Sequence, residues 1–520
     1  MSPKILRSTY VVGGMTVISR ITGFLRDIVF ARAFGAGAGM DAFVVAFQIP
    51  NFLRRLFGEG AFSQAFVPVF SEYHHKRQPE EVRELAARVT GTFATFLFVI
   101  TLVGVIASPL LILLFSAGFA DNERQYGLAV AMLRLTFPYI FFISLTALAA
   151  GILNTLGRFA VPAFTPVLLN ICLIGGALLI APRLEEPIVG VAIGVFVAGV
   201  VQLAFQLPFL ARLGLLRRPR WGGSHEGVRR IAVLMLPAIF GSSVAQLNLL
   251  IDRHIASWLQ TGSISWLYYS DRIMEFPLGV FSIALGTVIL PGLSEKYARQ
   301  EMADFSATLD WALRLVLMIV IPASVAMFVL AAPILSTLFQ HGDFNSTDTM
   351  MAAYSVRAYA LGLLGFAMVK VLAPAYFSRQ DTKTPVRIGV IAMLANIVLN
   401  IVIVLPMVTT GFVAPHTGLA LATGLAACLN AGLLFRGLLQ REVYRPTTGW
   451  LLMMVRYAMA NVAMAVVLVW LAGNIDWWIA AQWQERAWRL SQCVIAGSVV
   501  YFAALFLIGF RPGQLRATAS

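Results

Sequence analysis

Apolar segments long enough to cross a membrane follow one another along the whole chain. A transmembrane α-helix needs about 20 predominantly apolar residues, and the sequence contains about fourteen such segments separated by polar loops. They lie near residues 6–34, 40–70, 90–116, 128–156, 162–182, 188–211, 228–258, 264–293, 308–339, 350–377, 385–405, 413–437, 449–473 and 490–510. The pattern predicts an all-α polytopic membrane protein with about 14 transmembrane helices.

The pattern repeats halfway along the chain. The segment VPVFSEY, which contains Pro68, returns as LPGLSEKY, which contains Pro291. A second pair of related segments, around Pro162 and Pro385, has the same separation along the chain. Each copy holds six predicted helices, and an even number keeps both copies in the same orientation. Parallel repeats are typical of transporters with two lobes around a central cavity. The expected parts are an N-lobe, a C-lobe and an additional pair of C-terminal helices, at residues 1–215, 216–440 and 441–520.

Charged residues are scarce, and most of the positive ones lie on one side of the predicted membrane. They make up 12% of the chain, against roughly 25% in soluble domains, and the net charge is +14. Loops on the side of the N-terminus carry 23 Lys and Arg residues, and those on the other side carry 4. The positive-inside rule then places both termini in the cytoplasm, and it explains the net charge without a nucleic-acid partner.

The most basic loop joins the two predicted lobes. It spans residues 211–230 and contains the sequence Arg-Arg-Pro-Arg. Two interpretations are open, a solvated cytoplasmic linker or a segment that touches the anionic headgroups of membrane lipids. Of the two, we favour the solvated linker.

One stretch, residues 19–73, combines an apolar composition with many charges. The charged positions before its end are Arg20, Arg26, Asp27, Arg32, Asp41, Arg54, Arg55 and Glu59. A charge at the centre of a membrane helix costs about 3 to 17 kcal/mol, so such residues normally face a partner or a cavity. Arginines outnumber acids five to three in this set. The surplus indicates an anionic ligand, such as a phosphorylated lipid or solute that enters a cavity.

The helical spacing brings two of these arginines onto one broad arc. At about 100° per residue, Arg20 and Asp27 share a face of the first helix, and Arg26 lies about 120° from Arg20. A guanidinium group offers phosphate oxygens a planar fork and does not lose its proton. We therefore expect both arginines to line a phosphate site. The alternative is a set of structural ion pairs with Asp27 or Asp41.

The second half contains a matching cluster. The sequence SDRIMEF places Asp271, Arg272 and Glu275 within about one helical turn, in the helix that the repeat pairs with that of Arg54. Cationic sites in the two lobes would together form one anion pocket. The charged neighbours expected to support or gate this pocket are Asp27, Asp41, Arg55, Glu59, Asp271 and Glu275.

The remaining polar residues suggest no other chemistry. The three cysteines lie inside apolar segments, where packing is their expected role. Asp310 and Arg314 are four residues apart and are expected to form a simple pair along one helix. The sequence has no glycine-rich phosphate loop, no H-x-x-x-H pattern and no convincing Ser/His/Asp set. We therefore expect no metal or cofactor, and ATP is not the obvious energy source.

Several long motifs resemble those of the MurJ (MviN) lipid II flippases of bacteria. They are SRITGFLRD, DAFVVAFQIPNFLRRLFGEGAFSQAFVPVF, YYSDRIMEFPLGV, ALGTVILPGLS and VLAPAYFSRQDTKTPV, and the resemblance covers essentially the whole chain. It implies the fold of the multidrug/oligosaccharidyl-lipid/polysaccharide exporter superfamily, with two six-helix lobes and two extra C-terminal helices. It also implies transfer of the undecaprenyl-diphosphate-linked disaccharide-pentapeptide, lipid II, from the inner to the outer leaflet for peptidoglycan synthesis.

The resemblance also assigns roles to residues. The family's essential, substrate-binding arginines match Arg20, Arg26, Arg54 and Arg272. An acidic residue of the family's second span matches Asp41. A sodium site of some members is not clearly matched, and Asp381 is the one polar position that could be aligned with it. The C-terminal helices of the family form a groove for the polyprenyl tail, which implies that role for residues 441–520.

The same resemblance implies a cellular setting. We expect a monomer in the bacterial inner membrane, with lipid II and membrane lipids as its partners. Membrane potential or an ion gradient is the expected energy source, since no ATP-binding motif is present.

Two other functions stay open at this point. The protein could export another polyprenyl-linked oligosaccharide or a cationic drug, although a drug exporter should present acids in its cavity, where arginines dominate here. It could instead be a membrane-embedded enzyme, such as a polyprenyl-phosphate glycosyltransferase. Such an enzyme usually presents acidic residues on substantial loops, whereas the outer loops here are short.

Overall fold

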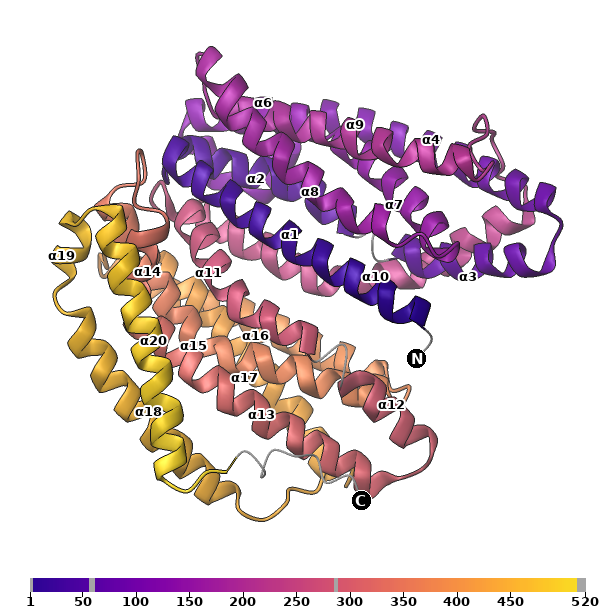
Figure 1. Ribbon diagram of the computed structural model, residues 1–520. Helices are drawn as coiled ribbons and strands as arrows, with labels where there is room; N and C mark the ends of the chain where they lie inside the picture. The colour runs from indigo at the N-terminus through magenta and orange to yellow at the C-terminus, as the bar shows by residue number, and fades with distance from the viewer. Residues whose placement is uncertain (1–2, 56–60, 285–288, 512–520) are drawn as a thin grey trace. The chain divides into compact units, whose positions relative to one another are not determined.

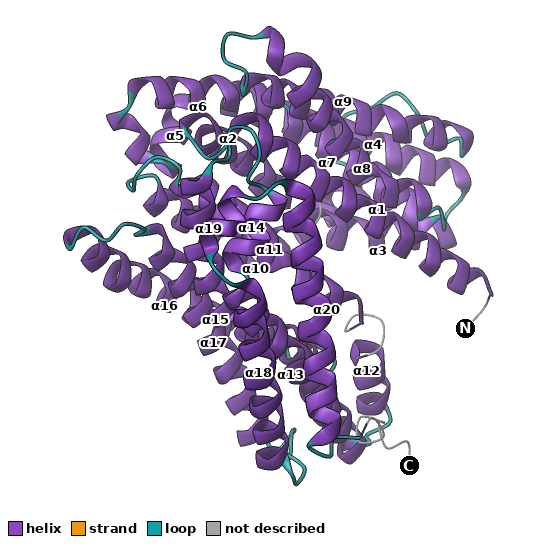
Figure 2. Ribbon diagram, turned by 60° about the vertical axis from the view of Figure 1, so that its left-hand side comes forward, coloured by secondary structure: helices purple, strands orange, loops and turns teal. Residues whose placement is uncertain are grey.

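The computed structural model describes residues 3–55, 61–284 and 289–511 (Figure 1). Within these ranges the regular structure is helical throughout, and no strand occurs (Figure 2). The prediction of an all-α fold is therefore confirmed.

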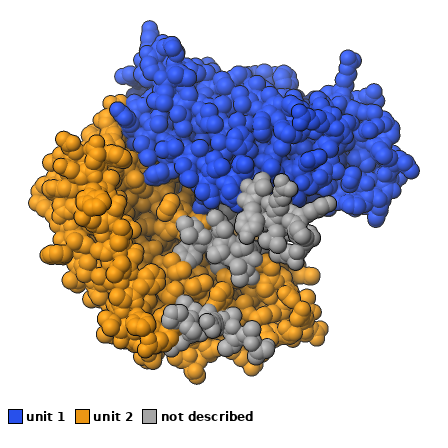
Figure 3. Space-filling view, viewed as in Figure 1, with its two compact units in different colours: residues 1–265 blue, residues 266–520 orange. Residues whose placement is uncertain are grey.

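The helices divide between two compact units, residues 1–265 and 266–520, which Figure 3 colours separately. The first contains α1 (Pro3–Phe34), α2 (Ala38–Leu53), α3 (Ala61–Lys76), α4 (Pro79–Ile106), α5 (Ser108–Phe115), α6 (Glu123–Thr136), α7 (Tyr139–Thr155), α8 (Ala160–Gly175), α9 (Val189–Arg212) and α10 (Glu226–Ala256). The second contains most of α11 (Ser263–Ala284), then α12 (Leu290–Ala298), α13 (Met302–Val329), α14 (Ala331–Leu338), α15 (Ser346–Phe377), α16 (Lys383–Thr409), α17 (His416–Gln440), α18 (Trp450–Ala472), α19 (Ile475–Ala480) and α20 (Trp483–Leu507).

The helix boundaries repeat with the offset of the sequence motifs. In the first half α1, α4, α6 and α8 begin at Pro3, Pro79, Glu123 and Ala160. In the second half α10, α13, α15 and α16 begin at Glu226, Met302, Ser346 and Lys383, each separated from its counterpart as Pro291 is from Pro68. The short helices α5 and α14 also keep this offset, from Ser108 to Ala331. The repeat inferred from four prolines thus extends through the helical order of both halves.

The boundary between the two packing units falls later in the sequence than the boundary between the two repeats. By its sequence position α10 opens the second repeat, yet it packs against α3 and belongs to the first unit. The division after Ser265 therefore describes packing. The functional lobes at 1–215 and 216–440 and the C-terminal part at 441–520 stay a prediction.

Ten helical segments among the described residues are long and apolar enough to cross a membrane. The four other predicted spans fall on α1, α2, α10 and α11. These helices carry charged residues that are discussed below. Because the four are not among the ten, the count of fourteen stays a prediction. The single span predicted over 40–70 stays a prediction, because the structure describes only part of the segment that joins α2 to α3. There α2 ends at Leu53, directly before the charged pair Arg54 and Arg55, and α3 begins at Ala61. Residues 56–60 lie outside the described residues.

Small residues allow the long helices to approach closely. A Cβ atom on Gly362 of α15 would lie 2.2 Å from the Cα atom of Gly424 on α17, and one on Gly176 would lie 2.5 Å from the carbonyl oxygen of Gly190 at the start of α9. Such contacts are typical of membrane helices, because lipid supplies no hydrophobic force to drive helices together and close packing must do so.

The last two long helices, α18 and α20, run side by side and pack against α13 (Figure 1). Their buried contact includes Tyr457, Met464 and Leu468 of α18 and Cys493 of α20. The hydroxyl of Tyr501 on α20 donates a hydrogen bond of 2.6 Å to the carbonyl oxygen of Met318 on α13. The C-terminal pair is thus an integral part of the second unit.

Candidate functional site

Arg26 is held in place by residues of α1 and α8, which pack against each other. Its Nε and Nη2 atoms donate to one oxygen of Asp27 at 3.0 and 2.7 Å. Its Nη1 atom donates to the side-chain oxygen of Asn170 on α8 at 3.0 Å. The guanidinium is 11% exposed and the carboxylate 3%. Burial strengthens this charge-assisted contact and fixes the direction of the guanidinium fork.

Asn170 in turn is anchored to α1. Its amide nitrogen donates to the carbonyl oxygen of Ser19 and to the hydroxyl of Thr22, both at 3.1 Å. Gly23 lies beside this amide, and a Cβ atom there would make only an ordinary contact of 3.5 Å with the amide nitrogen. A buried amide in a membrane helix needs such partners.

Arg20 lies less than two turns before Arg26 on α1 and is exposed. Among the residues that the structure describes, it has neither an acidic partner nor a side-chain hydrogen bond. The structural ion pair that was the alternative for these arginines therefore exists for Arg26 and is not formed by Arg20. One positive charge on this stretch of α1 remains available to an anion.

Arg54 follows the last residue of α2, and its Nε atom donates to the side-chain oxygen of Asn51 at 2.9 Å. The next residue, Arg55, is exposed. Glu59, expected as a supporting acid, lies outside the described residues. The first unit thus contains Arg20, Arg26 and Arg54 on two helices.

Asp41 has other partners than the predicted arginines. It is 2% exposed and accepts hydrogen bonds from the backbone nitrogens of Gly262 and Ser265, at 2.7 and 2.8 Å. The hydroxyl of Ser265 donates to it at 2.5 Å. Because these donors lie at the start of α11, the Asp41 carboxylate ties the first turn of α2 to the turn between α10 and α11. The expectation that Asp41 holds one of the four predicted arginines stays a prediction, and the tertiary fold brings these backbone donors to it together with the charge of Arg253.

The cluster predicted in the second unit is present on α11. The Nη1 atom of Arg272 donates to Glu275 at 2.8 Å, and the guanidinium lies 4.9 Å from the ring centre of Tyr268. A cation above an aromatic face is attracted by the ring quadrupole. Arg272 and the neighbouring Asp271 are half-buried. This unit therefore presents an oriented arginine with an acidic and an aromatic partner.

Sequence reasoning missed the neutral partners of these arginines. Asn51, Asn170 and Tyr268 were not selected, although Asn170 carries a signal, an amide in the middle of an otherwise apolar segment. Asn51 and Tyr268 carry no such signal in the sequence, because their role depends on the arginine that the structure places beside each of them.

The loop between α15 and α16 contains Asp381, the position aligned with a sodium site. Its carboxylate accepts from Arg441 at 2.7 Å and from the backbone nitrogen and hydroxyl of Thr384 at 3.0 and 2.7 Å. Burial acts to raise the pKa of Asp381, but the bonds from Thr384 and Arg441 outweigh it and lower the pKa below its usual value. Both carboxylate oxygens thus have protein donors. Within the described ranges, no group of three or more His, Cys, Asp or Glu side chains is placed to hold a metal ion.

An apolar groove of about 460 Å³ lies on the second unit, between α13, α15 and α18. Its lining includes Ile321, Val325 and Phe328 of α13, Leu361 and Leu364 of α15, and Ala465 of α18. Phe328 and Leu361 are exposed at its edge. The groove matches a hydrocarbon chain in polarity, and α18 contributes Ala465 to it. The role of residues 441–520 in binding a polyprenyl tail stays a prediction.

The chain is similar to known proteins over nearly its whole length. The model of the family described as lipid II flippase MurJ matches residues 30–485. The probable lipid II flippase MurJ of Vibrio cholerae is 48% identical over 524 residues, covering 99% of this chain and 98% of the relative. Lipid II flippase MurJ of Burkholderia cenocepacia is 40% identical over 521 residues, covering 99% and 100%.

Solved structures extend the comparison. Lipid II flippase MurJ in an inward closed conformation matches with a TM-score of 0.78 and 28% identity, covering 95% of this chain and 98% of that one. An inward-facing multidrug resistance MATE family transporter of the MOP superfamily matches with a TM-score of 0.65 at 15% identity, covering 83% and 97%, and shows the shared fold. The protein is a multi-pass membrane protein and belongs to the lipid II flippase MurJ family, whose members are transporters and not enzymes.

Proposed function

We propose that this chain flips lipid II from the cytoplasmic to the periplasmic leaflet of the bacterial inner membrane, where it serves peptidoglycan synthesis. Two relatives that match the whole chain, at 48% and 40% identity, have this activity in their names. The observation that carries the proposal is the unbalanced charge on α1. Arg26 is neutralised by Asp27, whereas Arg20 has no acidic partner among the described residues. A diphosphate group in contact with α1 would supply the missing negative charge.

Arg20, Arg26, Arg54 and Arg272 together form the proposed diphosphate site. Arg26 is oriented by Asp27 and Asn170, and Arg272 by Glu275 and Tyr268. Phosphate oxygens accept the same paired N–H bonds that carboxylates accept. The substrate can therefore replace Asp27 or Glu275 as the acceptor without leaving a guanidinium unpaired in the membrane.

The groove between α13, α15 and α18 is the proposed path of the polyprenyl tail. Its lining is almost entirely hydrocarbon, with Ser324 the one hydroxyl residue, and the serine hydroxyl donates to the carbonyl oxygen of Ala360. A long tail can stay in contact with lipid there while the polar head crosses. The C-terminal helices at 441–520 would then serve tail binding.

The proposed cycle is alternating access of two lobes, biased by membrane potential or an ion gradient. Both termini are cytoplasmic in this scheme, and the monomer is the working unit. Cysteine pairs across the cytoplasmic ends of the second and eighth spans should then crosslink in one state only. Crosslinking that ignores substrate and leaves transport intact would exclude this motion.

The experiment that tests the function measures the accessibility of labelled lipid II at the outer surface of cells depleted of this protein. Accessibility should fall on depletion and return with the native chain, but not with Arg20→Gln. Arg158→Gln is the matched control, because Arg158 is also an exposed arginine without an acidic partner among the described residues. Unchanged accessibility after depletion would reject the proposed function.

A further inference from the structure

The loop that follows the first repeat is fixed to α4 by its backbone. The nitrogen of Arg220 donates to the carbonyl oxygen of Ala87 at 3.1 Å, and that of Gly222 to the hydroxyl of Thr92 at 2.9 Å. The fit is close, because a Cβ atom on Gly91 would lie 2.3 Å from the carbonyl oxygen of Arg220. Residues 220–222 are therefore docked on α4 through their backbone, while the side chains of Arg220 and Trp221 stay exposed.

The loop after the second repeat docks at the equivalent place on α13. By the offset of the repeat, Tyr444 is the counterpart of Trp221, and its partner Asp310 is the counterpart of Ala87. The two aromatic residues nevertheless differ in their surroundings. Tyr444 is 1% exposed, whereas Trp221 is 65% exposed. Protein atoms therefore cover Tyr444 at the docking site on α13, whereas Trp221 at the docking site on α4 is left exposed.

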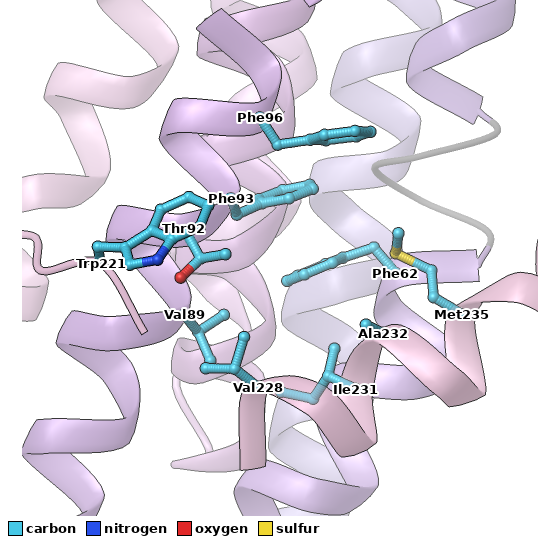
Figure 4. A pocket seen from close by; sticks show the side chains of 10 residues that line it. All are labelled: Phe62, Val89, Thr92, Phe93, Phe96, Trp221, Val228, Ile231, Ala232 and Met235. Atoms are coloured by element: carbon cyan, nitrogen blue, oxygen red, sulfur yellow. The ribbon is translucent and has the colours of Figure 1, made fainter. Parts of the chain in front are cut away.

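An apolar pocket of about 260 Å³ lies beside Trp221 (Figure 4). The rings of Phe62 and Phe93 stack in it with their centres 4.3 Å apart. Helix α10 supplies Val228, Ile231, Ala232 and Met235. The one aliphatic hydroxyl in the lining, on Thr92, already accepts a bond from Gly222. The pocket thus presents a hydrocarbon surface that suits an acyl chain.

The position of Phe96 shows that the pocket opens toward lipid. Phe96 lines the pocket and is 46% exposed. Val99 and Val103 follow it at helical spacing and are likewise exposed. Residues three, four and seven apart share a face of a helix. Phe96 therefore belongs to the apolar stripe that α4 turns to the membrane.

Two arginines without acidic partners stand next to the lining residues in sequence. Arg220 precedes Trp221, and Arg229 follows Val228 and lies one turn before Ala232 on α10. Both are exposed, and neither pairs with an acid among the described residues. Their neighbours Arg217 and Arg230 do pair, with Glu80 and Glu72. Among the described residues, arginines without an acidic partner beside an exposed tryptophan and an apolar pocket match an anionic lipid headgroup.

We propose that this pocket binds one acyl chain of an anionic phospholipid, whose phosphate is held by Arg220 and Arg229. The lipid takes the place that protein atoms fill around Tyr444 in the second repeat, and it secures the 220–222 segment on α4. The site lies wholly within the first unit and contains none of the four arginines proposed for the diphosphate.

The test uses the fluorescence of Trp221 in the full chain reconstituted in liposomes. Bromine atoms on an acyl chain quench tryptophan on contact, and the part due to Trp221 is the difference between the native chain and Trp221→Phe. Brominated phosphatidylglycerol should quench this part at a lower mole fraction than brominated phosphatidylcholine. One arginine near an anionic headgroup contributes about fivefold in affinity, so Arg220→Gln and Arg229→Gln should each weaken the response about fivefold.

Two further variants locate the site. Ala232→Phe fills the pocket and should remove the preferential quenching, whereas Arg158→Gln, an exposed arginine elsewhere in the chain, should leave it unchanged. Equal quenching by both lipids, or a preference that survives in both arginine variants, would overturn the proposal. If brominated phospholipids leave Trp221 unquenched while undecaprenyl phosphate shifts its emission, the pocket binds a polyprenyl tail and the proposal is equally wrong. None of these outcomes depends on flipping activity.

Discussion

The hydroxyl of Tyr444, in the loop between α17 and α18, donates a hydrogen bond of 2.7 Å to the buried carboxylate of Asp310 on α13. The same carboxylate accepts from the indole nitrogen of Trp450 at 2.8 Å and from the hydroxyl of Thr447 and Nε of Arg314, both at 2.7 Å. The spacing of Asp310 and Arg314 predicted only a local pair. The structure instead makes Asp310 the point where the loop before α18 is joined to α13.

Replacing Asp310 should therefore destabilise the C-terminal part of the chain. Asp310→Ala removes the acceptor shared by Arg314, Trp450, Thr447 and the buried Tyr444 hydroxyl, and loss of one partner of a buried pair typically costs about 3–5 kcal/mol. Tyr444→Phe removes a single hydrogen bond and should cost about 1 kcal/mol. Thermal unfolding of the purified protein measures both. Asp343→Ala, in an exposed loop, is the control, and an equal effect of Asp310→Ala and Asp343→Ala would contradict the assignment.

The direction of the Arg26 side chain should matter as much as its charge. Arg26→Lys keeps the charge but loses the fork that reaches Asp27 and Asn170 together. We expect flipping to fall about tenfold, equivalent to about 1.4 kcal/mol, with normal abundance. Arg20→Lys, Arg54→Lys and Arg272→Lys should also impair flipping. Full growth with all four variants at native abundance would show that these arginines do not bind the diphosphate.

Asn170 allows the orientation of Arg26 to be tested without changing any charge. Asn170→Leu removes the acceptor of Arg26 and should lower flipping in the same way, whereas Asn170→Gln retains an amide and should be milder. Lipid II accessibility at the outer surface, normalised to protein abundance, is the readout. A normal rate in Asn170→Leu would show that Asp27 alone positions the guanidinium.

Some features of the fold and of the candidate site could be predicted from the sequence, and others could not. The offset of Pro68 and Pro291 predicted the helical repeat, because local motifs recur wherever the same helix recurs. Arg20 and Arg26 were placed on one helix by spacing alone. Asn170 and Asp41 depend on tertiary contacts, since their partners lie on elements 144 to 224 residues away. No local pattern encodes such neighbours.

The difference in exposure between Trp221 and Tyr444 is a second feature that could not be predicted from either residue alone. Both aromatic residues occupy equivalent positions in the repeat, and neither residue by itself indicates that one is buried and the other exposed. Burial of Tyr444 follows from the Asp310 carboxylate, whereas the position equivalent to Asp310 is Ala87, which offers only its backbone.

The pair of Asp381 and Arg441 predicts a pH-dependent contribution to stability. The pKa of Asp381 is lowered in the folded protein, so its contribution is present above the ordinary value near 3.8 and is lost as the pH falls through the lower folded value. The pair is partly exposed, which limits the effect to about 0.5 kcal/mol. Thermal unfolding of Asp381→Asn should therefore differ from the native chain at pH 6, and the difference should shrink below pH 4. A difference that stays constant with pH would contradict this account.

The acids Glu275 and Asp41 should differ in their effect on lipid II binding when neutralised, because they have different partners. Glu275→Gln weakens the hold on Arg272, so the guanidinium should bind phosphate more tightly and release it more slowly. The expected protein is a stalled carrier, with normal abundance, equal or stronger lipid II binding and reduced flipping. Asp41→Asn keeps one carbonyl oxygen but loses the charge that receives three bonds from Gly262 and Ser265.

We therefore expect Asp41→Asn to reduce flipping without strengthening lipid II binding, since it loosens the α10–α11 turn and its charged neighbour Arg253 is not one of the four proposed diphosphate-binding arginines. Lipid II binding to the purified protein and leaflet accessibility in cells, measured for both variants, separate the two effects. Asp343→Asn controls for the loss of one negative charge. Stronger binding in Asp41→Asn would mean that Asp41 reaches an arginine during the cycle, and unchanged flipping in both variants would make the two acids structural neighbours only.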